Sequence, residues 1–258
     1  YVEFEDITMT ISLDSVSEFV DVLNLNATIL GDDGNTYVVT ASKEILTPKE
    51  TIELTIEEAN MVWDADEMVS VLTAKNDQME LSLTYAASWA TGPFSMLDVF
   101  LEESSVKYNG VALELESLDM LVTATKSEAG AVGYQVELKL VSSEPIQYNV
   151  SMFAQLPVED TVEIVLENLE VDESYAMDGG WIFLYGSNDE WDLLAGIYDW
   201  EMMEGTYAGE EEVMFYLSNM VTDHFTEQVY AELTVTNDPE KGWVIDIVSH
   251  CTDNVVYK

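Results

Sequence analysis

The feature that most constrains the fold is an internal repeat with a period of about 110 residues. The run TIELTIEE from Thr51 matches the run TVEIVLEN from Thr161, with apolar and polar positions in step. Farther along, Val122–Thr125 matches Leu233–Thr236. Self-similarity at a fixed spacing indicates that each period is one structural unit. The chain is therefore expected to consist of related units in series.

The N-terminal region matches only the second half of this unit. Tyr37 and Val39 align with Tyr148 and Val150, and the alternating run that starts at Leu23 aligns with one farther along at the same offset. The sequence thus predicts three regions. Residues 1–50 are the second half of a β repeat whose first half is missing, residues 51–160 are one β repeat domain, and residues 161–258 are another.

Secondary structure follows from apolar residues that alternate with polar ones. Ile7, Met9 and Ile11 alternate with threonine, a pattern of period two that indicates antiparallel strands with one buried face. Turn-forming runs such as 31–35 separate these strands. The predicted fold class is all-β, with tandem antiparallel β-barrel or β-sandwich repeats of about 110 residues. Short helices are expected only near 210–220 and 95–103.

The charge balance excludes whole classes of partner. The chain has 51 acidic residues against 8 basic ones, a net charge of −43, and every basic residue is lysine. Phosphate recognition needs Lys or Arg to displace counterions, so nucleic acid is excluded as a partner. An acidic surface suits either a halophile's cytoplasm or an extracellular surface, and the absence of arginine favours the second. No run of 18 apolar residues occurs, so no transmembrane span is expected.

No residue pattern typical of catalysis is present. His250 and Cys251 are adjacent, but neighbours in a strand point to opposite faces and could not form a thiolate–imidazole pair. Two histidines and one cysteine are too few for a convincing zinc site. Paired carboxylates at a distance suited to glycoside hydrolysis would arise by accident in so acidic a chain. We therefore expect a protein that is not an enzyme and that carries no catalytic residues.

Two acidic turns have the composition of a calcium site. Oxygen ligands in turns suit Ca²⁺, which is the only cofactor that the sequence suggests, but neither turn has EF-hand spacing, and solvated turns are the alternative. The candidate metal ligands are Asp32, Asp33 and Asn35 in the first turn and Asn188, Asp189, Glu190 and Asp192 in the second.

A cluster of aromatic residues in the last repeat is the candidate ligand site. Aromatic faces stack on sugars or small apolar ligands, and the alternative is that the rings fill the interior of a barrel or sandwich. The candidate ligand-binding residues are Trp181, Phe183, Tyr185, Trp191, Tyr198 and Trp200.

Several short motifs carry a resemblance to a known group of proteins. The run LENLEVDESY from Leu166, the run FLYGSNDE from Phe183 and the Asp33-Gly34 hairpin followed by Tyr37 resemble secreted or surface proteins of Bacteroidota with tandem calycin-like (lipocalin-like) β repeats. The resemblance implies exported or lipid-anchored proteins, mostly of unassigned role. It implies no catalytic residues.

These observations lead to two functional hypotheses. The first is a non-enzymatic extracellular or cell-surface protein with a structural, adhesive or assembly role, secreted or anchored as an outer-membrane lipoprotein, whose partner is a second copy or a surface protein. A half-domain at residues 1–50 would leave strand edges unpaired, which favours assembly. The second is a lipocalin-like binding module that takes a small ligand or glycan through the aromatic cluster.

Overall fold

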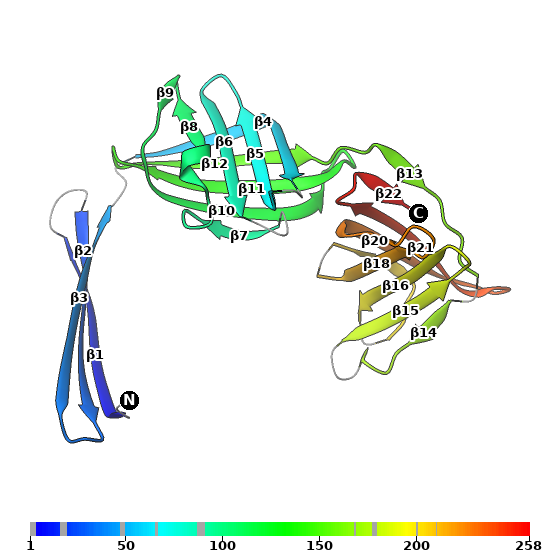
Figure 1. Ribbon diagram of the computed structural model, residues 1–258, viewed down its shortest axis with the longest axis horizontal. Coiled ribbons are helices and arrows are strands. Elements are labelled where there is room, and N and C mark those ends of the chain that lie inside the picture. Colours follow the sequence, from blue (N-terminus) through cyan, green and yellow to red (C-terminus); the bar gives the residue numbers. More distant parts are fainter. Residues whose placement is uncertain are drawn as a thin grey trace. The chain divides into compact units, whose positions relative to one another are not determined.

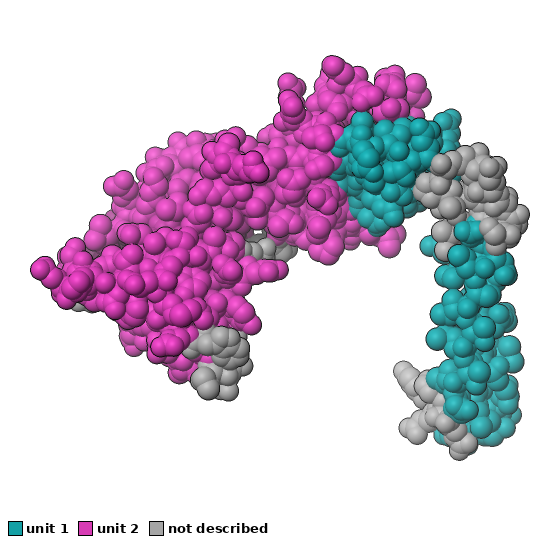
Figure 2. All heavy atoms as spheres, turned by 180° about the vertical axis from the view of Figure 1, so that it is seen from behind, with its two compact units in different colours: residues 1–54, 113–119, 138–150 teal, residues 55–112, 120–137, 151–258 magenta. Residues whose placement is uncertain are grey.

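The computed structural model describes residues 4–15, 20–46, 50–64, 67–86, 91–167, 169–176, 180–199, 201–209 and 211–258. The fold is all-β, as predicted, with 70% of residues in strands and 2% in helix. The chain forms two compact units, one of residues 1–54, 113–119 and 138–150 and the other of residues 55–112, 120–137 and 151–258 (Figure 2).

The first strands form a three-stranded antiparallel sheet in the order β1-β2-β3. Its strands are β1 (Phe4–Ser15), β2 (Val20–Gly31) and β3 (Thr36–Leu46). Alternation gives this sheet one apolar face and one face of mainly threonine, serine and asparagine. The apolar face consists of four rows of three cross-strand neighbours: Ile7, Ile29 and Tyr37; Met9, Ala27 and Val39; Ile11, Leu25 and Ala41; Leu13, Leu23 and Lys43.

A nine-stranded sheet follows in the order β7-β10-β11-β12-β4-β5-β6-β8-β9, and it curves into a half-barrel (Figure 1). Its inner positions, such as Leu72, Leu83 and Val136, are completely buried. The elements are β4 (Glu50–Asp64), β5 (Val69–Lys75), β6 (Met79–Ala86), β7 (Gly92–Ser95), the 3-10 turn η1 (Leu101–Glu103), β8 (Ser105–Tyr108), β9 (Val111–Ala112), β10 (Leu115–Lys126), β11 (Val132–Ser142) and β12 (Ile146–Gln155). The strands from β4 to β12 are called the middle domain below.

The remaining strands form two five-stranded sheets, ordered β13-β22-β21-β20-β17 and β14-β15-β16-β18-β19. One apolar cluster contains buried residues from both sheets. Ile182, Leu184 and Ile197 come from the sheet of β15 and β16, and Leu233 and Val235 come from the sheet of β20 and β21. The strands are β13 (Asp160–Val162), β14 (Glu170–Asp172), β15 (Trp181–Ser187), β16 (Trp191–Tyr198), β17 (Gly205–Ala208), β18 (Val213–Asn219), β19 (His224–Phe225), β20 (Gln228–Asp238), β21 (Gly242–Cys251) and β22 (Val255–Tyr257). These strands are called the C-terminal domain below.

The strand orders of the two domains correspond element by element. In the middle domain, β7-β10-β11-β12 lie on one side of β4 and β5-β6-β8-β9 lie on the other. In the C-terminal domain, β17-β20-β21-β22 follow the same order next to β13, and β15-β16-β18-β19 follow the same order next to β14. The single long strand β4 takes the place of the two short strands β13 and β14. Pairing register also recurs between β1-β2 and β20-β21, because Ile11 pairs with Leu25 and Leu233 pairs with Ile247, each 222 residues farther on.

The expected helices are wrong in their main part. The described part of 210–220 contains strand β18, in which Val213, Phe215 and Leu217 are buried and Tyr216 is exposed, a period of two rather than of 3.6. Strand β18 pairs with β16 along its whole length, so tertiary pairing overrides the helix-forming glutamates that precede it. In the segment 95–103, only the three residues of η1 are helical.

Candidate functional site

A row of aromatic rings lies on the outer face of the sheet that contains β15, β16 and β18. On β15, Ile182 and Leu184 are completely buried in the core, so Trp181, Phe183 and Tyr185 point to the other face. The ring centroids of Trp181 and Phe183 are 6.4 Å apart with nearly parallel planes, and those of Phe183 and Tyr185 are 6.5 Å apart. We call this surface the aromatic face; its rings belong to Tyr175, Trp181, Phe183, Tyr185, Tyr198 and Tyr216.

Two glycines make room for these rings. A Cβ atom on Gly196 would lie 3.1 Å from Cε3 of Trp181 and 3.2 Å from Cε of Met214, so the indole and the methionine methyl group lie over the glycine. A Cβ on Gly180 would lie 2.8 Å from the Tyr198 ring, and the φ angle of +72° there also favours glycine. The rings are therefore packed against bare backbone rather than projecting singly into solvent.

Carboxylates flank the aromatic face. Glu170 is the cross-strand neighbour of Tyr185 and Asp172 that of Phe183, so both acids project from β14 on the same side as the rings. The Ser174 side chain and backbone N–H hydrogen-bond to the Asp172 carboxyl group and lower its pKa. No Lys or Arg occurs in the sequence between Lys139 and Lys241, so the aromatic face has carboxylates beside it but no cationic residue from its own segment.

The predicted ligand residues thus fall into different places. Trp181, Phe183, Tyr185 and Tyr198 meet on the aromatic face. Trp191 lies on the inner side of β16 in line with buried Leu193, and its ring packs edge-on against Tyr257 at 5.9 Å. Trp200 lies outside the described residues.

Sequence reasoning missed Tyr216. It lies on the aromatic face because it is the cross-strand neighbour of Leu194 on β16, which in turn pairs with Tyr185. Because a helix was expected at 210–220, Tyr216 was not grouped with the aromatic residues of the predicted strands. The short apolar run from Val213 to Leu217, which follows Glu212 and precedes Ser218, was the signal that could have found it, because a run of this length is typical of a strand.

A cavity of about 870 Å³ lies between the two sheets of the C-terminal domain. Apolar side chains line much of it, among them Leu166, Phe215 and Ile247. Two of the chain's eight lysines, Lys241 and Lys258, also line it. The size is within the range of about 300–1,000 Å³ typical of small-molecule sites.

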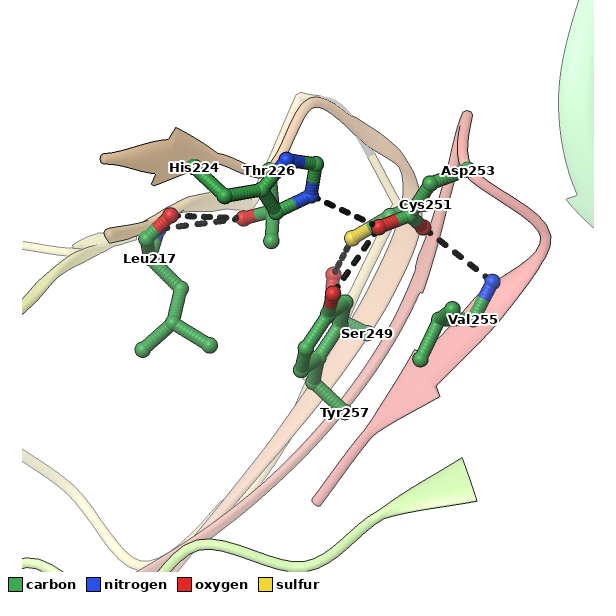
Figure 3. A network of polar contacts seen from close by, with 8 residues as sticks. All are labelled: Leu217, His224, Thr226, Ser249, Cys251, Asp253, Val255 and Tyr257. Atoms are coloured by element: carbon green, nitrogen blue, oxygen red, sulfur yellow. Dashed lines mark hydrogen bonds and ion pairs between the residues drawn. The ribbon is translucent and has the colours of Figure 1, made fainter. Parts of the chain in front are cut away.

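Cys251 and His224 belong to a polar cluster at the end of β21 (Figure 3). Burial raises the pKa of the Cys251 thiol to about 11, so the thiol is protonated at neutral pH and is not a thiolate nucleophile. Its sulfur atom lies 3.5 Å from Oγ of Ser249. His224 Nε2 lies 3.2 Å from Oδ2 of Asp253, and the same oxygen accepts a 2.8 Å hydrogen bond from the Tyr257 hydroxyl group. These contacts tie β19 to the β21–β22 turn.

The acidic turns use their oxygen atoms internally. Asp33 accepts hydrogen bonds from the backbone and side chain of Asn35 and from the Tyr37 hydroxyl, which together lower its pKa. Asn188 Oδ1 accepts from the backbone N–H groups of Glu190 and Trp191. Within the described ranges, no three His, Cys, Asp or Glu side chains converge on a point where they could hold a metal ion.

The predicted turn residues are therefore placed as follows. Asp32, Asp33 and Asn35 lie in or next to the β2–β3 turn, and Asn188, Asp189, Glu190 and Asp192 lie in or next to the β15–β16 turn. Asn76 makes two Oδ1 contacts in the β5–β6 turn that match those of Asn188, accepting from the backbone N–H groups of Gln78 and Met79. The recurrence at equivalent turns is what a structural role for these asparagines predicts.

Comparisons with known proteins give no guide to the site. The chain matches no protein-family model, no curated protein and no solved structure. Among the described residues, no helix is long and apolar enough to cross a membrane.

Proposed function

We propose that this chain is a non-enzymatic extracellular or cell-surface protein of tandem β domains, and that it self-associates through the apolar face of the β1–β2–β3 sheet. The assembly is structural or adhesive. The two whole repeats are the middle and C-terminal domains, and residues 1–50 form the half-repeat through which two copies meet.

The observation that carries this proposal is a difference in burial between equivalent residues. Ile7, Met9 and Ile11 are 50%, 57% and 59% exposed. The residues 111 positions later, Leu118, Met120 and Val122 on β10, are 1%, 2% and 2% exposed. On the neighbouring strand the difference is smaller: Leu23 is exposed and Leu25 is half-buried, whereas the corresponding Tyr134 and Val136 are both buried. The small side chain of Ala27, in the middle strand, is itself buried. The same kind of sheet face is thus buried in the middle domain, whereas in the β1–β2–β3 sheet most of its side chains are exposed or half-buried.

A second copy is the occupant that the chemistry of this face favours. Its four rows contain eleven apolar side chains and Lys43, and Asp21, at the end of β2, is the one carboxylate that follows them on the same side, in a chain of net charge −43. Two such faces can therefore approach with much less repulsion than acts elsewhere on the surface. Strands of about twelve residues make a sheet of about 40 Å by 14 Å. Two of them packed face to face would bury roughly 1,100 Å², which is near the lower limit for a specific interface.

Strand order and charge support the rest of the proposal. The element-by-element correspondence of the two domains and the shared register of β1-β2 and β20-β21 favour tandem duplication. An acidic surface without arginine suits an extracellular setting. The resemblance to exported repeat proteins of Bacteroidota agrees with a secreted or lipid-anchored protein.

Light scattering during size-exclusion chromatography tests the self-association. At about 0.1 mM protein the wild type is expected to be a dimer, and Ile11→Glu is expected to be a monomer because it places a charge in the centre of the apolar face. Thr10→Glu is the matched control, since it adds the same charge to the opposite face. A monomeric wild type, or equal loss of the dimer in both variants, would contradict the proposal.

The cavity of the C-terminal domain favours a second candidate function, the binding of a small apolar ligand. The lipocalin-like alternative relied on the aromatic cluster, whereas the cavity is a separate place between the two sheets. Trp243 lines it and provides a fluorescence signal. Titration with an apolar dye should quench or shift that signal in the wild type, and Ile247→Trp, which fills the cavity, should abolish the change. No response in the wild type would remove this candidate.

A further inference from the structure

We propose that the aromatic face binds arginine- or lysine-rich segments of a partner protein, with the rings contacting the cationic groups and Glu170 and Asp172 pairing with them. This site is distinct from the β1–β2–β3 face, and the proposal does not depend on self-association.

The first step of the argument is that an aromatic sheet face is left open to solvent. Tyr175, Tyr185, Tyr198 and Tyr216 are all exposed, although each is on or beside strands whose other side forms the core. Gly196 and Gly180 let the rings lie close to the backbone, so the face is built as a continuous surface. Large exposed apolar patches on soluble domains mark interaction sites.

The second step is the charge of the surroundings, which selects the chemistry of the ligand. Aromatic faces attract cations through the ring quadrupole, and guanidinium groups stack on them while pairing with carboxylates. Glu170 and Asp172 stand directly opposite Tyr185 and Phe183. The chain has no arginine and no lysine between Lys139 and Lys241, and the lysine ion pairs of the described residues are with Glu80 and Glu232, so a partner is the source of the cation. Anionic ligands are repelled by the same charges.

The third step is the contrast with the equivalent face of the middle domain. There the positions of Tyr185, Leu194 and Tyr216 are taken by Thr73, Ser82 and Ser105, which occupy the same cross-strand register. That face also has its own cation, because Lys107 lies 3.6 Å from Glu80. Among the described residues, the middle domain thus pairs a carboxylate of this face with a lysine and has polar side chains at the three positions compared, whereas the C-terminal domain has tyrosine rings there and no lysine paired with Glu170 or Asp172.

Calorimetric titration with a short peptide of alternating arginine and serine tests the proposal at about 0.15 M salt. The wild type should bind it, and the peptide in which citrulline replaces arginine should bind much more weakly. Tyr185→Ser and Tyr216→Ser should each weaken binding by about three- to ten-fold, because each removes one ring from the face. Phe100→Ser, which removes an exposed aromatic residue from the middle domain, should leave the affinity unchanged.

Two charge variants separate this site from general attraction to a polyanion. Glu170→Gln with Asp172→Asn removes two charges at the aromatic face, and Glu116→Gln with Asp119→Asn removes two exposed charges on β10. The first pair should weaken binding several-fold more than the second. Equal losses in the two pairs, or wild-type affinity in both tyrosine variants, would overturn the proposal. Binding of a neutral hexasaccharide such as cellohexaose in place of the arginine peptide would also overturn it.

Each variant must first be shown to fold. Tyr185 and Tyr216 are exposed, so their replacement should change the melting temperature little. If the melting temperature of one tyrosine variant falls sharply, the affinity of the other variant tests the proposal. The Glu170 and Asp172 variant keeps the hydrogen bond to the Ser174 backbone N–H, because the asparagine oxygen accepts it as well.

Discussion

The middle and C-terminal domains share a strand order but differ in how they fill the inside of the sheet. In the middle domain Leu54, Ile56 and Tyr134 are buried and close the interior. In the C-terminal domain the residues at the corresponding places, Ile164, Leu166 and Ile245, are only partly buried and line the cavity. The difference follows from β4, which is one strand of 15 residues, whereas β13 and β14 have three residues each.

The two domains also differ on the outer face of the same strands. Polar Thr73 and Ser82 in the middle domain correspond to Tyr185 and Leu194 in the C-terminal domain. Most inner positions of the two domains are apolar in both, with buried Ser70 as an exception, while several outer positions are polar in one domain and aromatic or aliphatic in the other. The comparison indicates that the inner face specifies this architecture and that the outer face and the continuity of one strand are free to vary with function.

The largest change in stability is expected at Gly133, in the closed interior of the middle domain. A Cβ atom there would lie 2.3 Å from the Ala154 carbonyl oxygen, which belongs to the backbone and cannot move aside cheaply. Gly133→Ala is therefore expected to lower the free energy of unfolding by about 3 kcal/mol. The equivalent position in the C-terminal domain is Val244, 111 residues farther on, and Val244→Ala should cost about 1 kcal/mol or less. Urea denaturation measures both, and similar losses would contradict the comparison.

The next largest change in stability is expected at two equivalent interior residues, one in each domain. Val136 is completely buried, and Ile247, its counterpart 111 residues later, lines the cavity. Val136→Ala leaves a void in a filled interior and should cost about 2 kcal/mol. Ile247→Ala removes more methyl groups yet should cost only about 1 kcal/mol, because its side chain already borders open space. If Ile247→Ala proves the more destabilising in urea, the cavity is closed in solution.

Cys251 is expected to make the stability of the C-terminal domain depend on pH in a way that the middle domain does not share. It corresponds to buried Leu140 of the middle domain, and its burial raises the pKa of the thiol from 9.0 to about 11. Because the pKa of this thiol is higher in the folded than in the unfolded state, the neutral thiol contributes its full stabilisation below pH 9. This contribution is lost as the pH rises through 11. The contribution is up to about 3 kcal/mol.

The measurement is the difference in unfolding free energy between the wild type and Cys251→Ala at several pH values. Tyrosines also ionise at high pH, but they are common to both proteins and cancel in the difference except for Tyr257, whose pKa is raised in part by Cys251. The advantage of the wild type at pH 7 should shrink steadily between pH 9 and pH 11. An advantage that stays constant over this range would show that the thiol is not buried.

The sequence predicts the inner faces well and the outer faces poorly. Period-two alternation is enough to place Ile52, Leu54 and Ile56 on the inner side of β4, and the all-β class follows from such runs. The same alternation at Ile7, Met9 and Ile11 predicted a buried face, but that face is exposed. Alternation does not say which side of β15 is buried, because Ile182 and Leu184 are as apolar as Trp181 and Phe183. Both faces of that strand are apolar, so only the packing of the other sheet decides that the rings point outward.

Strand β18 shows the other limit of prediction from sequence. Its acidic N-terminal flank resembles the start of a helix, and the pairing with β16 that makes it a strand joins residues far apart in the chain. The acidic turns were correctly located as turns, but their oxygen atoms serve as hydrogen-bond acceptors for the turn itself. Calcium binding at these turns stays a prediction without support from the described geometry.

The smallest expected effect concerns the ion pair of the middle domain. Lys107 Nζ lies 3.6 Å from Glu80 Oε1, and both side chains are exposed. Solvent and salt screen such a pair, so Lys107→Ser should change the unfolding free energy by no more than about 0.5 kcal/mol. Ser218 occupies the matching position in the C-terminal domain, so the variant gives the two domains the same residue there. A larger loss, removed by about 0.5 M salt, would show that the outer face of the middle domain stabilises its sheet and is not merely a solvated surface.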